Sequence, residues 1–189
     1  MGKSDPQAAL DFWPTPFEIT RALLGIHPPP RHSVIIEPSA GDGSIASVLR
    51  LGGYTVIGVE IQPRFKESLE VQCHQVLIKD WLAFSLSDTY ISRNDSIACI
   101  GNPPYKPAKL MVAHVEHALQ LADYVAMLLP CTFLHSYERV RFNRTYPVNG
   151  YYPIAKRPSC SRDTSVGKRD LSWFVWDKRM GMMQRIAIL

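Results

Sequence analysis

The segment 33–61, SVIIEPSAGDGSIASVLRLGGYTVIGVEI, contains two apolar, β-branched runs separated by a glycine-containing turn and an amphipathic stretch. Runs such as "SVIIEPS" and "TVIGVEI" are typical of short strands that are buried on both faces. The stretch "GSIASVLRLGG" between them has the pattern of a helix and ends at a glycine pair. A strand, a helix and a second strand in this order predict a βαβ unit with parallel strands.

The same alternation continues along the chain. Further strands are expected at "VLIKD", "SIACIGN" and "YVAMLLP", and further helices at "PRFKESLEV" and "KPAKLMVAHVEHALQLA". After these, "FLHSYERVRFNRTY" has the pattern of a helix with a basic face, whereas "YYPIAKRP" and "SWFVWDK" have that of two strands joined by a polar loop. We therefore predict an α/β fold with a mostly parallel sheet, closed by an antiparallel strand pair.

Composition favours one domain without a membrane segment. With 189 residues and 46% hydrophobic residues, the chain has the size and the apolar content for a single core. No apolar run approaches the ~20 residues that cross a bilayer, and the N-terminus has no apolar signal segment, so we expect a cytoplasmic protein. The four cysteines lack metal-ligand spacing and are interpreted as reduced thiols. His114 and His117 share a helix face but have no evident further ligands, so we predict no metal site.

The formal net charge of +4 is distributed unevenly. From Arg139 to the C-terminus, eleven lysines and arginines stand against three aspartates, a net charge of +8 that leaves −4 for the preceding residues. A basic lobe on an acidic body is typical of a protein that binds a polyanion on one side. A basic surface that is merely solvated explains the same distribution equally well.

The turn "EPSAGDG", 37–43, follows the first predicted strand and precedes a helix. Gly41 and Gly43 allow the backbone to approach a ligand, and the helix N-terminus offers free amide donors. The turn lacks the third glycine of a dinucleotide fingerprint and the lysine of a P-loop. Glu37 and Asp42 bring negative charge, which would repel a pyrophosphate but suit a cationic group.

Two further acidic residues end the next two predicted strands. Glu60 lies roughly 20 residues beyond the turn, where an acidic side chain in such folds binds ribose hydroxyls. Asp80 follows the third strand and is placed to accept a hydrogen bond from an adenine amine. Alone, each carboxylate is more commonly a helix cap or a surface acid, but three at the ends of successive strands favour one ligand site. A ligand with an adenosine, a cationic end and no phosphates is S-adenosylmethionine.

The stretch "CIGNPPYKPAKLM", 99–111, leaves a predicted strand through two consecutive prolines. Because proline has no backbone donor, the strand must stop at Gly101 and open into a rigid loop. We expect this loop to present Asn102 and Tyr105 outward.

Four motifs together resemble those of the class I S-adenosylmethionine-dependent methyltransferases, and among them the amino-methyltransferases that modify adenine in DNA. "NPPY" at 102–105 is similar to the family's catalytic motif, and "EPSAGDG" is similar to its cofactor motif. "FWPTPFEITRALL", 12–24, is similar to a motif that precedes the cofactor loop in one permutation class and holds the methionine part. "AKRPSCSRDTSVGKRDLSWFVWDK", 155–178, is similar to the end of small phage-type DNA methylases.

The resemblance implies a Rossmann-like class I methyltransferase fold with a seven-stranded sheet, in a bacterial or phage-infected cell. It divides the single domain 1–189 into an N-terminal extension (1–32), a cofactor-binding and catalytic core (33–132) and a basic part that binds substrate and closes the sheet (133–189). The implied reaction methylates the exocyclic amine of adenine in DNA, with the base flipped out of the duplex.

The resemblance also implies roles for individual residues. Asn102 and the carbonyl of Pro103 would accept the two hydrogens of the target amine, Pro104 would hold the loop and Tyr105 would stack on the base. The implied cofactor-binding residues are Thr15, Pro16, Glu37, Pro38, Ser39, Ala40, Gly41, Asp42, Gly43, Glu60, Ile61, Asp80, Trp81 and Asn102. The expected substrate-binding residues are Tyr105, Phe133, Arg139, Arg157, Lys168 and Arg169.

Simpler interpretations remain open for several of these residues. Phe133 is equally expected in the core, and Trp173 and Trp176 are more readily core residues than base-stacking ones. Thr15 and Pro16 otherwise form a helix start, with Thr15 as the cap and Pro16 in the first turn.

Other substrates keep the same chemistry. "NPPY" also occurs in RNA methyltransferases and in enzymes that methylate protein glutamine, although the latter usually carry an N-terminal helical domain and only about 32 residues precede the first strand here. A subunit that depends on a partner and has no catalysis of its own is a further alternative. Between 133 and 172 there is room for only a helix, a strand and a loop. We therefore predict a short or relaxed sequence preference, or recognition supplied by a partner subunit or a second copy of the chain.

Overall fold

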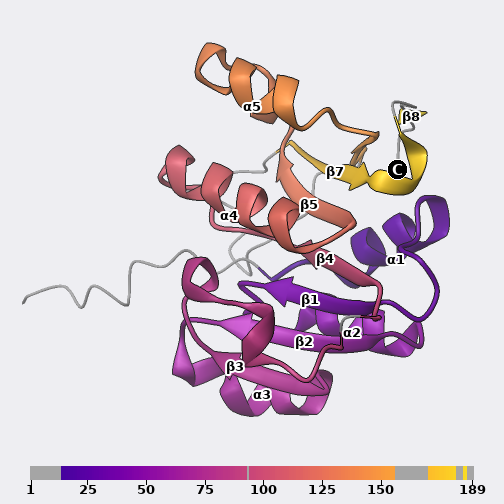
Figure 1. The fold of residues 1–189 in the computed structure, drawn as a ribbon, viewed down its shortest axis with the longest axis vertical. Helices are drawn as coiled ribbons and strands as arrows, with labels where there is room; N and C mark the ends of the chain where they lie inside the picture. The colour runs from indigo at the N-terminus through magenta and orange to yellow at the C-terminus, as the bar shows by residue number, and fades with distance from the viewer. Residues whose placement is uncertain (1–13, 93, 156–169, 182–184, 187–189) are drawn as a thin grey trace, which may run out of the picture.

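The computed structural model describes residues 14–92, 94–155, 170–181 and 185–186. Its strands form one sheet in the order β3-β2-β1-β4-β5-β7-β6-β8 (Figure 1). The strands are β1 (Val34–Pro38), β2 (Thr55–Glu60), β3 (Gln75–Ile78), β4 (Ile97–Gly101), β5 (Tyr124–Pro130), β6 (Gly150–Pro153), β7 (Leu171–Asp177) and β8 (Arg185–Ile186). The helices are α1 (Phe17–Ile26), α2 (Ser44–Leu51), α3 (Lys66–Gln72), α4 (Ala108–Leu121) and α5 (Val140–Thr145). Short 3₁₀ turns are Pro63–Phe65, Trp81–Ala83, Leu86–Asp88, Cys131–Leu134, Tyr137–Arg139 and Lys178–Met180.

Strands β1 to β5 run parallel to one another, and β7 pairs antiparallel with both β5 and β6. The predicted βαβ unit is present, with β1 pairing β2 from Val34 opposite Thr55 onward. β7 runs antiparallel to β5 along its whole length, from Tyr124 opposite Asp177 to Pro130 opposite Leu171. β6 is antiparallel to β7, and the two-residue β8 adds to β6 in parallel. The predicted seven-stranded, mostly parallel sheet with an antiparallel closing pair is confirmed, with β8 as a short eighth strand.

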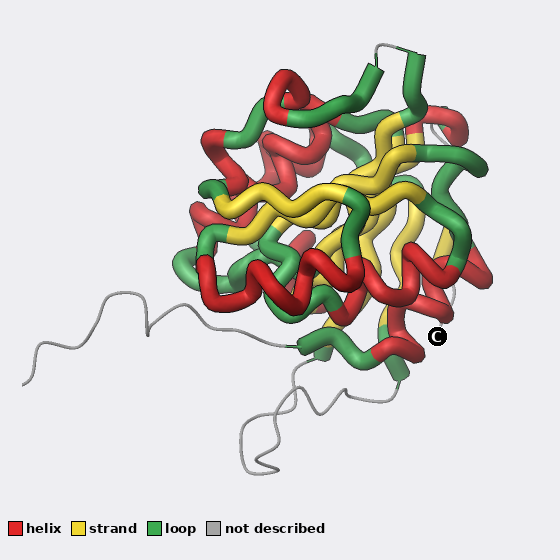
Figure 2. The backbone as a smooth tube through the Cα atoms, turned by 90° about the horizontal axis from the view of Figure 1, so that it is seen from below, coloured by secondary structure: helices red, strands yellow, loops and turns green. Residues whose placement is uncertain are grey.

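Two cores cover the two faces of the sheet, and Figure 2 shows the strands as a layer between helices. Residues of α1, α2 and α3 pack on one face, and residues of α4 and α5 pack on the other. Neighbouring strand residues alternate between the two cores, as Ile35 and Ile36 do in β1. Because both faces are buried, the strands are continuous apolar runs instead of alternating ones.

The single helix expected over 133–146 is wrong. The chain there forms two 3₁₀ turns, at Cys131–Leu134 and Tyr137–Arg139, before α5 begins at Val140. Phe133 and Phe142 are both buried, with ring centroids 5.8 Å apart. Nine residues of one continuous helix would set them about half a turn apart, on opposite faces. The chain therefore bends so that both rings reach the same core.

The structure also bears on the predictions for the tryptophans, the cysteines and the strand after residue 150. Trp173 and Trp176 are core residues, as interpreted. Cys73 and Cys99 are buried free thiols and Cys131 is a half-buried one, whereas Cys160 lies outside the described residues. The expected strand "YYPIAKRP" ends at Pro153 in the described part of the chain. None of the described helices is long and apolar enough to cross a membrane.

Candidate active site

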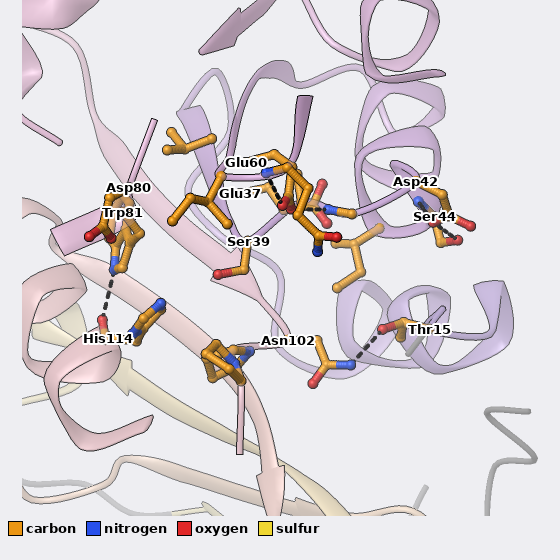
Figure 3. A pocket seen from close by; sticks show the side chains of 18 of the residues that line it. Thr15, Glu37, Ser39, Asp42, Ser44, Glu60, Asp80, Trp81, Asn102 and His114 are labelled. Atoms are coloured by element: carbon orange, nitrogen blue, oxygen red, sulfur yellow. Dashed lines mark hydrogen bonds between the residues drawn. The ribbon is translucent and has the colours of Figure 1, made fainter. Parts of the chain in front are cut away.

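A cavity of about 380 Å³ opens at the carboxyl ends of β1, β2, β3 and β4. Parallel strands bring the loops after them to one edge of a sheet, and cavities of about 300–1,000 Å³ are the usual size of ligand sites. Figure 3 shows the acidic residues and Asn102 around this space. The sequence-predicted residues that line it are Thr15, Glu37, Ser39, Ala40, Gly41, Asp42, Glu60, Ile61, Asp80, Trp81, Asn102, Pro103, Pro104 and Tyr105.

The turn after β1 folds sharply at alternate residues. Ser39, Gly41 and Gly43 have φ of 56°, 55° and 84°, in the left-handed region. Glycine adopts this region without strain, whereas Ser39 does so only because its surroundings hold it there. The result is a backbone that curls around one side of the cavity and leads directly into α2.

Glu60 holds this turn in place from the end of β2. Its Oε2 accepts from the backbone N–H of Gly41 at 2.8 Å, and its Oε1 accepts from that of Gln62 at 2.8 Å. The side chain is buried, at 3% exposure, yet it lines the cavity. Each carboxylate oxygen has two lone pairs, so both can accept a further donor such as a ribose hydroxyl.

Glu37, near the end of β1, carries a carboxyl group that is buried. Burial raises its pKa well above the ordinary value, the charges of Asp42 and Glu60 raise it further, and the backbone N–H of Ala46 partly opposes them. Among the described residues, nothing forms a hydrogen bond with its Oε2. A buried oxygen of this kind is stabilised by a donor or a positive charge that enters the cavity.

Asp42 and Asp80 both line the cavity and both accept hydrogen bonds at the start of a helical turn, and Asp80 is itself the N-cap residue. Asp42 Oδ1 accepts from the N–H and the hydroxyl of Ser44, at 3.0 and 2.6 Å, at the start of α2. Asp80 Oδ1 accepts from the N–H of Leu82 at 3.0 Å. The helix-cap interpretation is thus confirmed for Asp80, which at the same time lines the cavity.

Asn102 lies directly after β4, between two hydroxyl groups. Its Nδ2 donates to Thr15 Oγ1 at 3.1 Å, and its Oδ1 accepts from the hydroxyl of Tyr105 at 2.5 Å. The expectation that Tyr105 points outward is wrong, because this side chain is half-buried and packs against both cores. Thr15 does not cap α1 either, since the helix begins at Phe17 with Pro16 in the cap position.

An aromatic side chain, that of Trp81, lines the cavity next to Asp80. Trp81 is 2% exposed, stacks on Phe84 with centroids 5.2 Å apart, and donates from Nε1 to the carbonyl of His114 at 3.1 Å. His114 donates from Nδ1 to the carbonyl of Leu110, and burial lowers its pKa. Sequence reasoning did not place His114 or Leu110 at the site. Their signal is that they lie one turn apart on the helix that directly follows the proline loop.

Three predicted cofactor-binding residues do not line the cavity. They are Pro16, Pro38 and Gly43, each next to a lining residue in the sequence.

The proposed base contact of Phe133 is wrong, because its side chain is fully buried. Arg139 donates to the carbonyl of Thr132 at 3.1 Å and lies over the Phe133 ring. Arg157, Lys168 and Arg169 lie outside the described residues. In the described part of the chain, His, Cys, Asp and Glu form no cluster that would hold a metal ion.

Comparison with known proteins matches no family model and no curated protein sequence. Solved structures do match. A proposed RNA methyltransferase from Pyrococcus horikoshii has a TM-score of 0.70 at 18% identity, over 94% of this chain and 92% of that one. The methyltransferase subunit of a type I restriction-modification system from Streptococcus thermophilus has a TM-score of 0.66 at 13% identity, over 93% and 47%. A proposed class I S-adenosylmethionine-dependent methyltransferase from Listeria monocytogenes has a TM-score of 0.64 at 14% identity, over 92% and 63%.

These likenesses establish the fold as the Rossmann-like fold of class I methyltransferases. Of these three proteins, the one from Listeria is described as dependent on S-adenosylmethionine. The chain spans about half the length of the Streptococcus subunit and about two thirds of the Listeria protein.

Proposed function

We propose that the chain transfers a methyl group from S-adenosylmethionine to the exocyclic amine of adenine in DNA. The observation that carries this proposal is the position of Asn102, whose side-chain amide lines the same cavity as Glu37, Glu60 and Asp80. An uncharged acceptor for an amine and an acidic site for a cationic cofactor thus share one space.

The cavity suits the cofactor chemically. Glu37 offers an unpartnered buried oxygen among the described residues, and Asp42 and Glu60 add negative charge beside it, as a sulfonium or an ammonium group requires. Glu60 would hold the ribose, and Asp80 and Trp81 the adenine. When bound, S-adenosylmethionine would supply an electrophilic methyl group, and its sulfur would keep the electron pair of the broken S–C bond and leave as a neutral thioether.

The residues of the proline loop would orient the amine. The amine of adenine is a weak nucleophile because its lone pair is delocalised into the ring. Asn102 Oδ1 and the Pro103 carbonyl would accept its two hydrogens, which favours a pyramidal nitrogen whose lone pair can form the new N–C bond. The nitrogen gives up one proton to solvent after the bond has formed, so no strong general base is needed. Positioning and fixed dipoles then supply most of the catalysis.

A base in a duplex reaches this cavity only when it is flipped out of the stack. Tyr105 would stack on the flipped base, a contact worth about 1–3 kcal/mol. Phosphate contacts are proposed for the basic residues from Arg139 to Arg169, which lie in the C-terminal part with a net charge of +8. Because a phosphate-binding surface does not identify the sugar, RNA is the second candidate substrate.

The test is methyl transfer from labelled S-adenosylmethionine to unmethylated duplex DNA, with RNA and a protein extract assayed in parallel. We expect label in methylated deoxyadenosine after digestion of the DNA. Asn102→Ala should lower the rate by about 100-fold or more, the usual effect of removing a fixed group that stabilises the transition state. Label confined to RNA or protein would move the substrate class. No label despite tight cofactor binding would favour a partner-dependent subunit.

Sequence preference is a second readout of the same assay. We propose short or relaxed specificity, or recognition by a partner subunit, because the segment between 133 and 172 is too short for a sizeable recognition region. Mapping the methylated sites on a long DNA tests this. A strict site of about six base pairs for the isolated chain would overturn it.

A further inference from the structure

We infer that Thr15 is a positioning residue that fixes the orientation of the Asn102 side-chain amide. This inference rests on the proposed function, because the orientation matters only if Asn102 receives an amine. It gives Thr15 a task distinct from the cofactor contact expected from the sequence.

The contact joins two distant parts of the chain. Asn102 Nδ2 donates to Thr15 Oγ1 at 3.1 Å across 87 residues of sequence, and Figure 3 shows the two side chains pointing toward each other. Thr15 is only 5% exposed, so water competes little for its hydroxyl. The chain just before α1 is thereby tied to the loop that follows β4.

An asparagine amide has two ends of similar shape and opposite chemistry, since the oxygen accepts and the nitrogen donates. With Nδ2 held by Thr15, the oxygen is directed toward Tyr105, whose hydroxyl donates to it. A half-turn of the amide would direct Nδ2 there instead. An amine substrate would then meet N–H donors, and its hydrogens would have no acceptor on Asn102.

Thr15 also lines the cavity, so one hydroxyl can serve two neighbours. A hydroxyl can accept one hydrogen bond while it donates another. If its hydrogen is donated to the cofactor, only its lone pairs are left to face Asn102, and these accept Nδ2–H but reject Oδ1. Cofactor binding would thus reinforce the productive orientation of the amide.

Thr15→Val removes the hydroxyl while keeping the shape, and Thr15→Ser keeps the hydroxyl. We expect Thr15→Val to lower kcat by about tenfold, the effect of one lost hydrogen bond, and Thr15→Ser to restore it to within about twofold of the parent. Because Thr15 also lines the cavity, kcat is measured at saturating S-adenosylmethionine, so that a change in cofactor affinity does not enter the comparison. A kcat of Thr15→Val that equals that of the parent under saturation would overturn the positioning role.

Asn102→Asp provides a background in which orientation is irrelevant, because a carboxylate has two equivalent oxygens. There, Thr15→Val should change kcat by less than about twofold, so the two substitutions are strongly non-additive. Equal effects of Thr15→Val in both backgrounds would contradict the inference.

A readout without catalysis separates this inference from the proposed function. The side-chain amide of Asn102 is identified in ¹⁵N-correlated NMR spectra of the full chain as the signal pair that Asn102→Asp removes. Thr15→Val should shift this pair and Thr15→Ser should leave it near its original position. An unmoved pair in Thr15→Val would overturn the inference even if methyl transfer is observed. A moved pair would support the contact even if no substrate is methylated.

Discussion

The hydroxyl of Tyr105 donates to Asn102 Oδ1 at 2.5 Å and so occupies the acceptor proposed for the target amine. The same hydroxyl lies 3.3 Å from the carbonyl of Leu128 in β5. The ring is half-buried between the two cores. An incoming amine must therefore displace this hydroxyl or share the Asn102 oxygen with it, since an amide oxygen has two lone pairs.

Replacing Tyr105 by Phe or by Ala separates its ring from its hydroxyl. Tyr105→Phe keeps the stacking surface and removes the competing donor, so we expect KM for DNA to stay unchanged or to fall, with kcat retained. Tyr105→Ala removes the stacking surface as well. Its KM should rise by about 5- to 150-fold, which corresponds to about 1–3 kcal/mol. Steady-state kinetics with a methylatable duplex measures both.

Cofactor binding serves as the control for both variants and should change by less than about threefold. If Tyr105→Phe raised KM as much as Tyr105→Ala, the hydroxyl would be a substrate contact and not a competitor for Asn102.

Glu37→Gln tests whether the buried carboxylate recognises a cation. Loss of a charge-assisted contact should weaken S-adenosylmethionine binding by about 10- to 150-fold. In the parent, Glu37 ionises only near its raised pKa, which lies above the ordinary value of 4.5. The parent should therefore bind the cofactor more tightly as pH rises through that range. Calorimetric titration across pH should show this trend in the parent and its absence in Glu37→Gln.

Glu37→Gln should weaken cofactor binding but raise the stability of the folded chain at neutral pH. A carboxyl whose pKa is raised in the folded state contributes stability below its unfolded pKa and loses it as pH rises toward the folded value. Glu37→Gln should therefore melt above the parent at neutral pH, by about 2–4 °C for each kcal/mol gained. Glu67→Gln makes the same chemical change at an exposed position of α3 and should alter neither property. Equal cofactor binding by Glu37→Gln and the parent would contradict the assignment.

Gly43→Ala and Gly53→Ala compare the turn after β1 with a left-handed turn away from the cavity. Both glycines have φ of 84°, which costs an alanine about 1–2 kcal/mol, so both variants should melt roughly 2–8 °C below the parent. A Cβ at Gly43 would lie 3.0 Å from Gln72 Cγ and 3.3 Å from Leu69 Cδ2, whereas a Cβ at Gly53 meets no described atom within 4 Å. Only Gly43→Ala should also weaken cofactor binding. Unchanged binding in that variant would show that the turn does not shape the cavity.

Much of the site follows from the sequence because topology alone gathers it. Once β1, β2, β3 and β4 are assigned as parallel strands, the residues that end or follow them must meet at one edge of the sheet. Glu37, Glu60, Asp80 and Asn102 line one cavity for this reason. Burial of the sheet on both faces made the strands easy to identify as apolar runs.

The missing parts depend on packing between distant segments. Nothing local to Thr15 indicates that its hydroxyl accepts from Asn102, 87 residues away. Likewise, the meeting of Phe133 and Phe142 in one core overrides the helical pattern between them. His114 reaches the cavity only because α4 starts at the loop after β4, a placement that needs the direction of the helix as well as its pattern.

A buried carboxylate at the end of β7, that of Asp177, yields the last prediction. Asp177 Oδ2 lies 3.0 Å from His27 Nε2 and 2.6 Å from Arg179 Nη2, with Asp177 and His27 both buried. Burial alone would raise the pKa of Asp177, but its hydrogen bonds with Arg179 and His27 outweigh this effect and hold the pKa below the ordinary 3.8. These partners join the segment after α1 to the end of β7.

Asp177→Asn should therefore lower the free energy of unfolding by about 3 kcal/mol, because it weakens two charge-assisted hydrogen bonds, one with the buried His27 and one with the half-exposed Arg179. The melting temperature should fall by roughly 6–12 °C. Asp123→Asn is the matched control: Asp123 pairs with Lys178 at 2.7 Å, but both side chains are more than 60% exposed, so the loss should stay below about 1 kcal/mol. The contribution of Asp177 is present above pH 3.8 and is lost as pH falls below it, so the difference from the parent should shrink in acid. Similar melting of the two variants at neutral pH would mean that the buried pair does not stabilise the fold more than an exposed one.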